Sequence, residues 1–156
     1  MNYSTMPILL VEDDHIDVMN VQRAFKKNNI TNPLHIAFNG VDALNMLKGN
    51  EGKPKLNPIP KIILTDINMP KMNGIEFIKE LRKDPELSAI SVFVLSTSND
   101  ENDKIEAYKL NVAGYILKPV SFEKFVNLIT VLGNYWNLCA HPDTNLVPAK
   151  EIEDKA

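Results

Sequence analysis

The sequence predicts an α/β fold in which five strands and five helices alternate along the chain. Short apolar runs of strand length recur five times, and each is followed by a segment whose apolar residues have helical spacing. This alternation is typical of a parallel sheet covered by helices on both faces, with right-handed crossovers. We therefore expect a (βα)5 doubly wound parallel sheet with the flavodoxin-like strand order 2-1-3-4-5.

The predicted strands are short, apolar and β-branched, as is usual for strands that are buried on both faces. They cover Pro7–Val11, Leu34–Phe38, Lys61–Asp66, Ile90–Ser96 and Ala113–Leu117. The predicted helices cover Asp14–Asn28, a segment that starts at Asn39-Gly40, Gly74–Lys83, a segment from Asn99 or Asp100 to about Asn111, and a segment from Phe122 to about Leu132 or beyond. Each crossover thus has one helix of ordinary length.

The chain of 156 residues has the length of a single domain with a moderate surplus. The surplus lies in two places. Between Gly49 and Pro60, three prolines and two glycines occur among polar residues, which predicts a long loop. We expect residues 1–136 to form the domain, with an extended loop at 49–60 and an extended last helix, and residues 137–156 to form a poorly ordered tail.

The composition narrows the classes of function. The net charge is −3 and the basic residues form no block, so we expect no nucleic-acid partner. The single cysteine, Cys139, has no partner for a disulfide and lacks the spacing of a metal motif. No signal peptide and no apolar run of bilayer length is visible. We therefore expect a cytoplasmic protein with no membrane partner.

Polar groups follow four of the predicted strands at one edge of the sheet. The third strand ends at Asp66, the fourth ends at Ser96, and the fifth is followed by Lys118. The first strand is followed by three acids, Glu12, Asp13 and Asp14. Ligand sites of open α/β sheets lie outside the carboxyl ends of the strands, so we expect these groups to converge.

Carboxylates, a hydroxyl and an ammonium group in a small space indicate a divalent cation and a phosphoryl group. A hard cation such as Mg²⁺ prefers oxygen ligands and usually takes one or two carboxylates, with waters and phosphate oxygens. Asp66 could act as a nucleophile, since aspartyl-phosphate intermediates are an established form of covalent catalysis. Lys118 is suited to pair with a phosphate, and Ser96 could donate a hydrogen bond to it.

Each of these groups also has a simpler explanation. Acids at strand ends commonly cap the next helix, a serine there is often a turn residue, and a lysine is usually a solvated charge. These explanations would have to hold independently at four strand ends on the same edge. The conjunction therefore favours a functional site.

The segments that carry these groups closely resemble the receiver domain of two-component response regulators. The resemblance covers about Met6 to Leu132, nearly the whole ordered chain. The matching segments are Ile8-Leu9-Leu10-Val11-Glu12-Asp13-Asp14, Leu64-Thr65-Asp66-Ile67-Asn68-Met69-Pro70, Gly74, Val94-Leu95-Ser96-Thr97 and Gly114-Tyr115-Ile116-Leu117-Lys118-Pro119. Each alone is a weak signal, but their order and spacing together are specific.

The resemblance implies a phosphorylation site and a magnesium site. Asp66 is similar to the phosphoacceptor of the family. Asp13 and Asp66 would bind Mg²⁺ directly, together with the backbone carbonyl of Asn68, and Glu12 would act through water. Asp14 is similar to a variable third acid and would cap the helix that follows.

The resemblance also implies a switch. Lys118 is similar to the phosphate-binding lysine, and its bond to Pro119 would be cis. Ser96 takes the position of the switch hydroxyl, with Thr97 as an adjacent alternative. Tyr115 is similar to the aromatic switch residue, although a half-buried tyrosine at the sheet edge is an alternative interpretation.

The long loop and the C-terminal extension are similar to those of single-domain regulators paired with bacterial phytochrome kinases. Most apolar residues of the last helix are expected in the core. Tyr135 and Trp136 lie past the end of a minimal receiver, and both residue types are favoured interface anchors. We therefore expect a homodimer surface there, as part of a face formed by the fourth helix, the fifth strand and the fifth helix.

The predicted function is a stand-alone response regulator rather than an enzyme. A sensor histidine kinase would transfer a phosphoryl group to Asp66, and the output would be a contact with a protein effector or a histidine phosphotransfer protein. A phosphatase with Asp66 as nucleophile is disfavoured because such hydrolases place a second acid two residues on, where this chain has Asn68. A nucleotide-binding or flavin-binding module is disfavoured because no glycine-rich loop follows the first strand. A pseudo-receiver is disfavoured because every site residue is present.

Overall fold

The computed structural model describes residues 6–142 and contains a five-stranded parallel sheet. The strand order is β2-β1-β3-β4-β5, which confirms the predicted fold class and order. The strands are β1 (Ile8–Val11), β2 (Leu34–Ala37), β3 (Ile62–Thr65), β4 (Ser91–Ser96) and β5 (Gly114–Leu117). The helices are α1 (His15–Lys27), α2 (Gly40–Lys48), α3 (Gly74–Lys83), α4 (Glu101–Lys109) and α5 (Phe122–Leu138).

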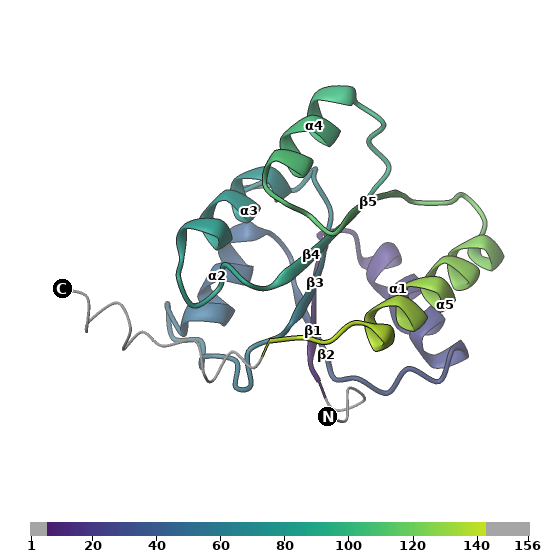
Figure 1. Cartoon of the computed structure of the whole chain (residues 1–156), viewed down its shortest axis with the longest axis horizontal. Helices are drawn as coiled ribbons and strands as arrows, with labels where there is room; N and C mark the ends of the chain where they lie inside the picture. Colours follow the sequence, from purple (N-terminus) through teal and green to yellow (C-terminus); the bar gives the residue numbers. More distant parts are fainter. Residues whose placement is uncertain (1–5, 143–156) are drawn as a thin grey trace.

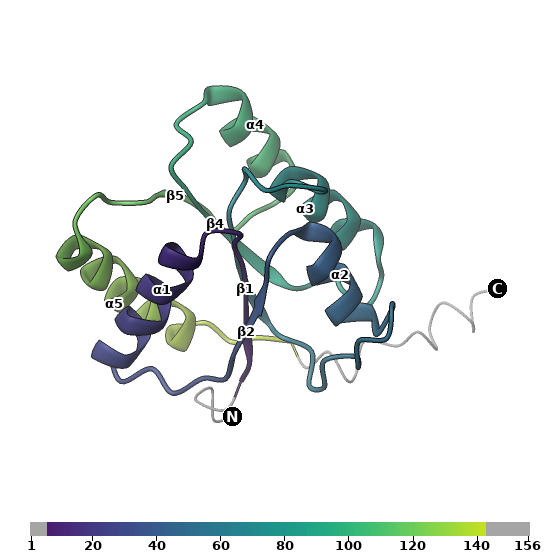
Figure 2. The same cartoon turned by 180° about the vertical axis from the view of Figure 1, so that it is seen from behind.

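Two helical layers cover the sheet. Helices α1 and α5 lie on one face, and α2, α3 and α4 lie on the other (Figures 1 and 2). Alternate residues of β1 enter different cores: Ile8 and Leu10 face the α1–α5 layer, whereas Leu9 and Val11 face the other layer. Because both faces of β1 and β3 are buried, apolar side chains occupy nearly every position of these strands.

The helices begin at polar caps that the sequence supplies. Asp14 accepts hydrogen bonds from the backbone N–H groups of Ile16 and Asp17, which confirms it as the cap of α1. Asp100, not Asn99, caps α4 through its side chain. These caps define the residue at which each helix starts after its strand. They therefore define which residues of the first helical turn lie near the edge of the sheet.

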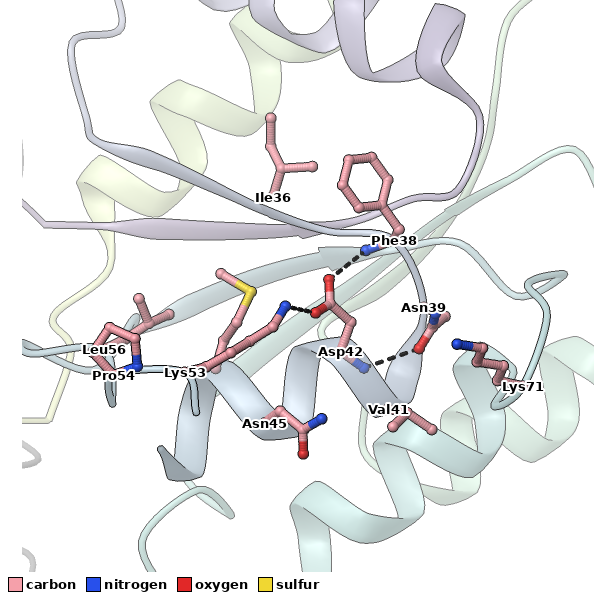
Figure 3. A pocket seen from close by; sticks show the side chains of 11 residues that line it. Ile36, Phe38, Asn39, Val41, Asp42, Asn45, Lys53, Pro54, Leu56 and Lys71 are labelled. Carbon is pink, nitrogen blue, oxygen red and sulfur yellow. Dashed lines mark hydrogen bonds and ion pairs between the residues drawn. The ribbon is translucent and has the colours of Figure 1, made fainter. Parts of the chain in front are cut away.

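The long loop between α2 and β3 folds against α2 (Figure 3). Lys53 pairs with Asp42, whose other carboxylate oxygen accepts the Phe38 N–H at 3.1 Å. The Leu56 N–H donates to the Met46 carbonyl at 3.0 Å, and the Leu56 side chain packs against the core. These contacts border an open pocket of about 560 Å³ beside the edge strand β2. The loop thus extends the α2 side of the domain away from the carboxyl edge of the sheet.

Helix α5 continues to Leu138, two residues past the predicted domain boundary at residue 136. Trp136 is 1% exposed and lies edge-on to Phe25 of α1 with ring centroids 6.1 Å apart. The expectation that Trp136 anchors a homodimer is therefore wrong: the helix buries it in the α1–α5 core. Tyr135 is 49% exposed. Residues 143–156 of the predicted tail lie outside the described residues.

No helix within residues 6–142 is long and apolar enough to cross a membrane.

Candidate phosphoryl-acceptor site

The carboxyl ends of β1, β3 and β5 bring three of the predicted site residues into direct contact. Lys118 follows β5, and its Nζ lies 2.5 Å from Glu12 Oε1 and 3.1 Å from Asp66 Oδ2. Ser96 ends β4, and its backbone carbonyl accepts the Lys118 N–H at 2.8 Å. The parallel register of the central strands places all four groups at one edge, as the sequence predicts.

Glu12, Asp13 and Asp66 form a cluster of carboxylates. One oxygen from each lies within 4.8 Å of one oxygen from each of the others. Their burial is graded: Glu12 is 2% exposed, Asp66 is partly buried, and Asp13 is open to solvent. A set of oxygen ligands with one open side fits a hard divalent cation that keeps part of its water shell.

Burial and neighbouring charges shift the ionisation of Glu12 and of the Lys118 ammonium beside it. Burial raises the pKa of the Glu12 carboxyl to about 7, although the hydrogen bond and charge of Lys118 oppose the shift and the charge of Asp66 adds to it. Burial alone would lower the pKa of the Lys118 ammonium, but the hydrogen bonds to Asp17 and Glu12 and the charge of Asp66 raise it above its usual value. Lys118 is therefore a permanent cation, and a divalent cation would relieve the remaining negative charge.

Both the side chain and the backbone of Asp66 are held by its neighbours along the chain. The Ile67 N–H donates to Asp66 Oδ1 at 2.6 Å, and the hydroxyl of Thr65 donates to the Asp66 carbonyl at 2.9 Å. Helix α3 begins so close to this carbonyl that a Cβ added at Gly74 would lie 2.1 Å from the carbonyl oxygen. Only glycine fits there, which explains why Gly74 accompanies Asp66 in the sequence.

Ser96 and Tyr115 both form hydrogen bonds with Ser98, which lies in the connection between β4 and α4. Ser96 is buried and its Oγ accepts the Ser98 N–H at 3.1 Å, whereas the neighbouring Thr97 is exposed. The buried position at the sheet edge favours Ser96 over Thr97 as the switch hydroxyl. Tyr115 is partly buried, and its hydroxyl donates to the Ser98 carbonyl at 2.8 Å. The segment from Ser96 to Ser98 therefore links the two predicted switch side chains.

Two further expectations have different outcomes. Among residues 6–142 the cis peptide bond is Asn57–Pro58, so the expectation of a cis bond between Lys118 and Pro119 is wrong. The sequence alone does not determine whether such a bond is cis or trans, because the preference of a bond before proline for the trans isomer is small. The role of the Asn68 carbonyl as a metal ligand stays a prediction; Asn68 itself is exposed, two residues after Asp66.

The structure adds a site residue that the sequence analysis did not identify. Asp17 Oδ2 lies 2.8 Å from Lys118 Nζ and so makes a third carboxylate contact to this lysine. Asp17 lies in the first turn of α1, three residues after the N-cap Asp14. No local pattern in the sequence marks Asp17, because its contact partner Lys118 lies 101 positions away and is brought to it by the fold.

Comparisons with known proteins agree with this geometry. Residues 8–130 match the response regulator receiver domain family. The response regulator Rcp1 of Synechocystis is 35% identical over 129 residues, which cover 83% of this chain and 87% of Rcp1. A probable methanogenesis regulatory protein, FilR2, of Methanothrix harundinacea is 34% identical over 129 residues, which cover 83% of this chain and 82% of that protein.

Solved structures are also similar. The phosphorylated cyanobacterial phytochrome response regulator RcpA superposes with a TM-score of 0.82 at 31% identity, over 89% of this chain and 99% of that chain. The Mn²⁺-bound form of Rcp1 superposes with a TM-score of 0.78 at 32% identity, over 88% and 99% of the two chains. The chain thus belongs to the response regulator receiver domain family of two-component systems, and its sequence and fold are similar to those of cyanobacterial phytochrome response regulators.

Proposed function

We propose that this protein is a response regulator that accepts a phosphoryl group from a sensor histidine kinase on Asp66. The observation that carries the proposal is the contact between Asp66 and the Lys118 ammonium, at 3.1 Å, beside a cluster of three carboxylates. This arrangement combines a carboxylate nucleophile, a cation for the phosphoryl oxygens and ligands for a metal ion.

The residues of the cluster fit Mg²⁺ by their chemistry. Asp13 and Asp66 would bind the ion directly with the backbone carbonyl of Asn68, and Glu12 would act through water. When bound, the ion neutralises negative charge that develops on the transferred phosphoryl group. The Mn²⁺-bound form of the similar protein Rcp1 supports a divalent cation in this chain.

In the reaction, a carboxylate oxygen of Asp66 attacks the phosphorus atom carried by the kinase histidine. The new P–O bond forms as the P–N bond breaks, and the electron pair of that bond returns to the imidazole ring. Lys118 holds an oxygen of the transferred group, because its ammonium already points at Asp66. The buried hydroxyl of Ser96 then turns toward the phosphoryl group and donates a hydrogen bond to it.

The output is a change in a protein contact surface. Movement of Ser96 breaks its bond with the Ser98 N–H, and the carbonyl of Ser98 is the acceptor of the Tyr115 hydroxyl. A shift of this segment therefore changes the position of Tyr115 and the surface formed by α4, β5 and α5. The partners are a sensor histidine kinase, of the phytochrome type by similarity to RcpA, and a protein effector or histidine phosphotransfer protein in the cytoplasm.

The proposal is tested by intact mass after incubation with Mg²⁺ and acetyl phosphate. We expect one added phosphoryl group on the wild type and none on Asp66→Asn, which retains the shape of the side chain but lacks the nucleophile. If the phosphoryl group is hydrolysed before it can be detected, binding of the stable beryllium and fluoride mimic of the phosphoryl group tests the same site. Labelling that persists in Asp66→Asn, or a wild type that takes up neither the phosphoryl group nor the mimic, would contradict the proposal.

A further inference from the structure

The contact between Lys118 and Asp17 joins two elements that the phosphorylation chemistry does not by itself require to touch. Lys118 lies between β5 and α5, and Asp17 lies in the first turn of α1. Their side chains lie 2.8 Å apart, and they are 10% and 34% exposed. A partly shielded ion pair of this length is a directed contact rather than a loose surface attraction.

The three hydrogen bonds of Lys118 use all of its donors. A lysine ammonium has three N–H bonds, and here they point at Glu12, Asp17 and Asp66. The bond to Asp66 is the longest of the three, at 3.1 Å. Two of the donors are thus directed to Glu12 and Asp17, and the third is aimed at the phosphoryl acceptor.

Asp17 differs from the other two partners because it lies outside the group of carboxylates that could hold a cation. That group consists of Glu12, Asp13 and Asp66. A cation bound there would attract the negative charge of Glu12 and Asp66 and so weaken their attraction for Lys118. Because Asp17 is outside that group, a bound cation would leave its contact with the ammonium in place.

There is room beside the Lys118–Asp17 ion pair for the Lys118 ammonium to move away from Asp66. A cavity of about 50 Å³ adjoins Lys118 and Asp17, between α1 and the start of α5, and is also lined by Asn20, Leu95 and Phe125. A lysine side chain is long and flexible, so without an anchor its ammonium would spend part of its time away from Asp66.

We propose that Asp17 is a positioning residue for the phosphoryl transfer: it anchors Lys118 to α1 and keeps one ammonium N–H aimed at Asp66. The inference rests on the proposed function and adds to it the residue that orients the phosphate-binding lysine. It also couples the start of α1 to the β5–α5 connection, because the two ends of the ion pair belong to those segments.

The test compares Asp17→Ala with Asp14→Asn. Each variant removes one negative charge from the start of α1, but Asp14 is exposed, is not among the carboxylates that bond Lys118, and asparagine replaces it as an equally good helix cap. Alanine suits the first turn of α1, and Asp17→Asn, which retains the shape of the side chain, serves as a second variant. Rates of phosphorylation by acetyl phosphate and half-saturating Mg²⁺ concentrations are measured for the wild type and all variants.

We expect Asp17→Ala to phosphorylate about tenfold more slowly than Asp14→Asn at saturating Mg²⁺, since misplacement of a reacting group by about 1 Å costs up to about a hundredfold. The Mg²⁺ requirement should change equally in the two variants, because each loses one negative charge at the start of α1 and neither residue belongs to the carboxylate group that could hold a cation. The ¹⁵N resonance of the Lys118 ammonium should shift in Asp17→Ala and stay in place in Asp14→Asn.

Equal rates in the two variants, with the wild type phosphorylated normally, would overturn this inference and leave the proposed function intact. A slower Asp17→Ala whose deficit disappears at higher Mg²⁺ would also overturn it, since Asp17 would then act on the cation and not on Lys118. A wild type that accepts no phosphoryl group would overturn the proposed function and this inference together.

Discussion

Glu12 is the residue at which burial and charge conflict most directly. It directly follows β1 with 2% of its surface exposed, and burial raises the pKa of its carboxyl to about 7 in spite of its bond to Lys118. The position is therefore costly in the absence of a cation. A bound cation would offset the charge of the buried carboxylate, so the unfavourable free energy of the empty site favours cation binding.

The raised pKa gives a prediction for the pH dependence of stability without divalent metal. The contribution of Glu12 is fully present below pH 4.5, where its carboxyl is protonated even in the unfolded chain, and is lost as the pH rises through about 7. From about pH 5 to pH 8, wild type should lose up to about 3 kcal/mol of unfolding free energy relative to Glu12→Gln. Urea unfolding at both pH values measures the difference, and the exposed Glu123→Gln is the control. Parallel pH profiles for wild type and Glu12→Gln would contradict the assignment.

At this scale the sequence predicted the principal groups of the site but not the full set of their contacts. Asp66, Ser96 and Lys118 were predictable because each ends or follows a recognisable apolar strand. Asp17 was not, because its role depends on a contact with Lys118, 101 positions away, that only the packing of α1 beside the β5–α5 connection creates. Strand-end position is a local signal, whereas the partner of a long side chain is a property of the fold.

At the scale of the elements, α3 holds Asp66, the proposed acceptor, in place through its close approach. The N–H of Gly74 donates to the Ile67 carbonyl at 2.8 Å, and the first turn of α3 leaves no room for a side chain beside the Asp66 carbonyl. The capping box formed by Asn73 and Glu76 fixes where this turn begins. The position of Asp66 is thus set as much by the helix that follows as by its own strand.

Gly74→Ala should therefore disturb both folding and the site. The added Cβ would lie 2.1 Å from a backbone oxygen, so α3 or the Asp66 backbone must shift. We expect a loss of unfolding free energy of about 1–3 kcal/mol or more and a slower phosphorylation of the folded fraction. Gly114→Ala is the matched control, because its Cβ would meet only the Phe93 side chain, at an ordinary 3.6 Å. Equal stabilities of the two variants, measured in urea, would show that the approach of α3 is not tight.

Helix α5 shows why a stripe of apolar residues does not by itself identify an interface. Helical spacing predicted both core and surface residues after Phe122, and the sequence could not decide on which side Trp136 falls. The structure places Trp136 in the core against Phe25 and leaves Val131, Tyr135 and Leu138 exposed, at 68%, 49% and 85%. The decision depends on the direction in which α5 crosses α1, which no local pattern encodes.

Over the whole molecule, the parallel order of the strands gathers the chemistry at one edge and leaves the flanks for contacts. The long loop lies against α2, and the α4–β5–α5 face carries exposed apolar side chains, among them Ile105, Tyr108 and Leu117. Tyr115, which connects to the Ser96–Ser98 segment, belongs to the same face. A contact made there would therefore respond to the state of Asp66.

We also expect the protein to self-associate through the α4–β5–α5 face. The three exposed large hydrophobic residues of α5, Val131, Tyr135 and Leu138, have helical spacing and form one apolar stripe that a second copy could cover. We expect a dimer at tens of micromolar in light scattering. Leu138→Glu combined with Val131→Glu should give a monomer, because charges would be buried in the contact.

The control is Val120→Glu, at a fully exposed position before α5 and outside the stripe, which should leave the dimer unchanged. A monomeric wild type at that concentration would contradict the expectation for the unphosphorylated protein. The measurement is then repeated with the beryllium and fluoride mimic bound at Asp66. If the dimer is part of the switch, the connection through Ser98 and Tyr115 requires that occupation of Asp66 changes the association of this face.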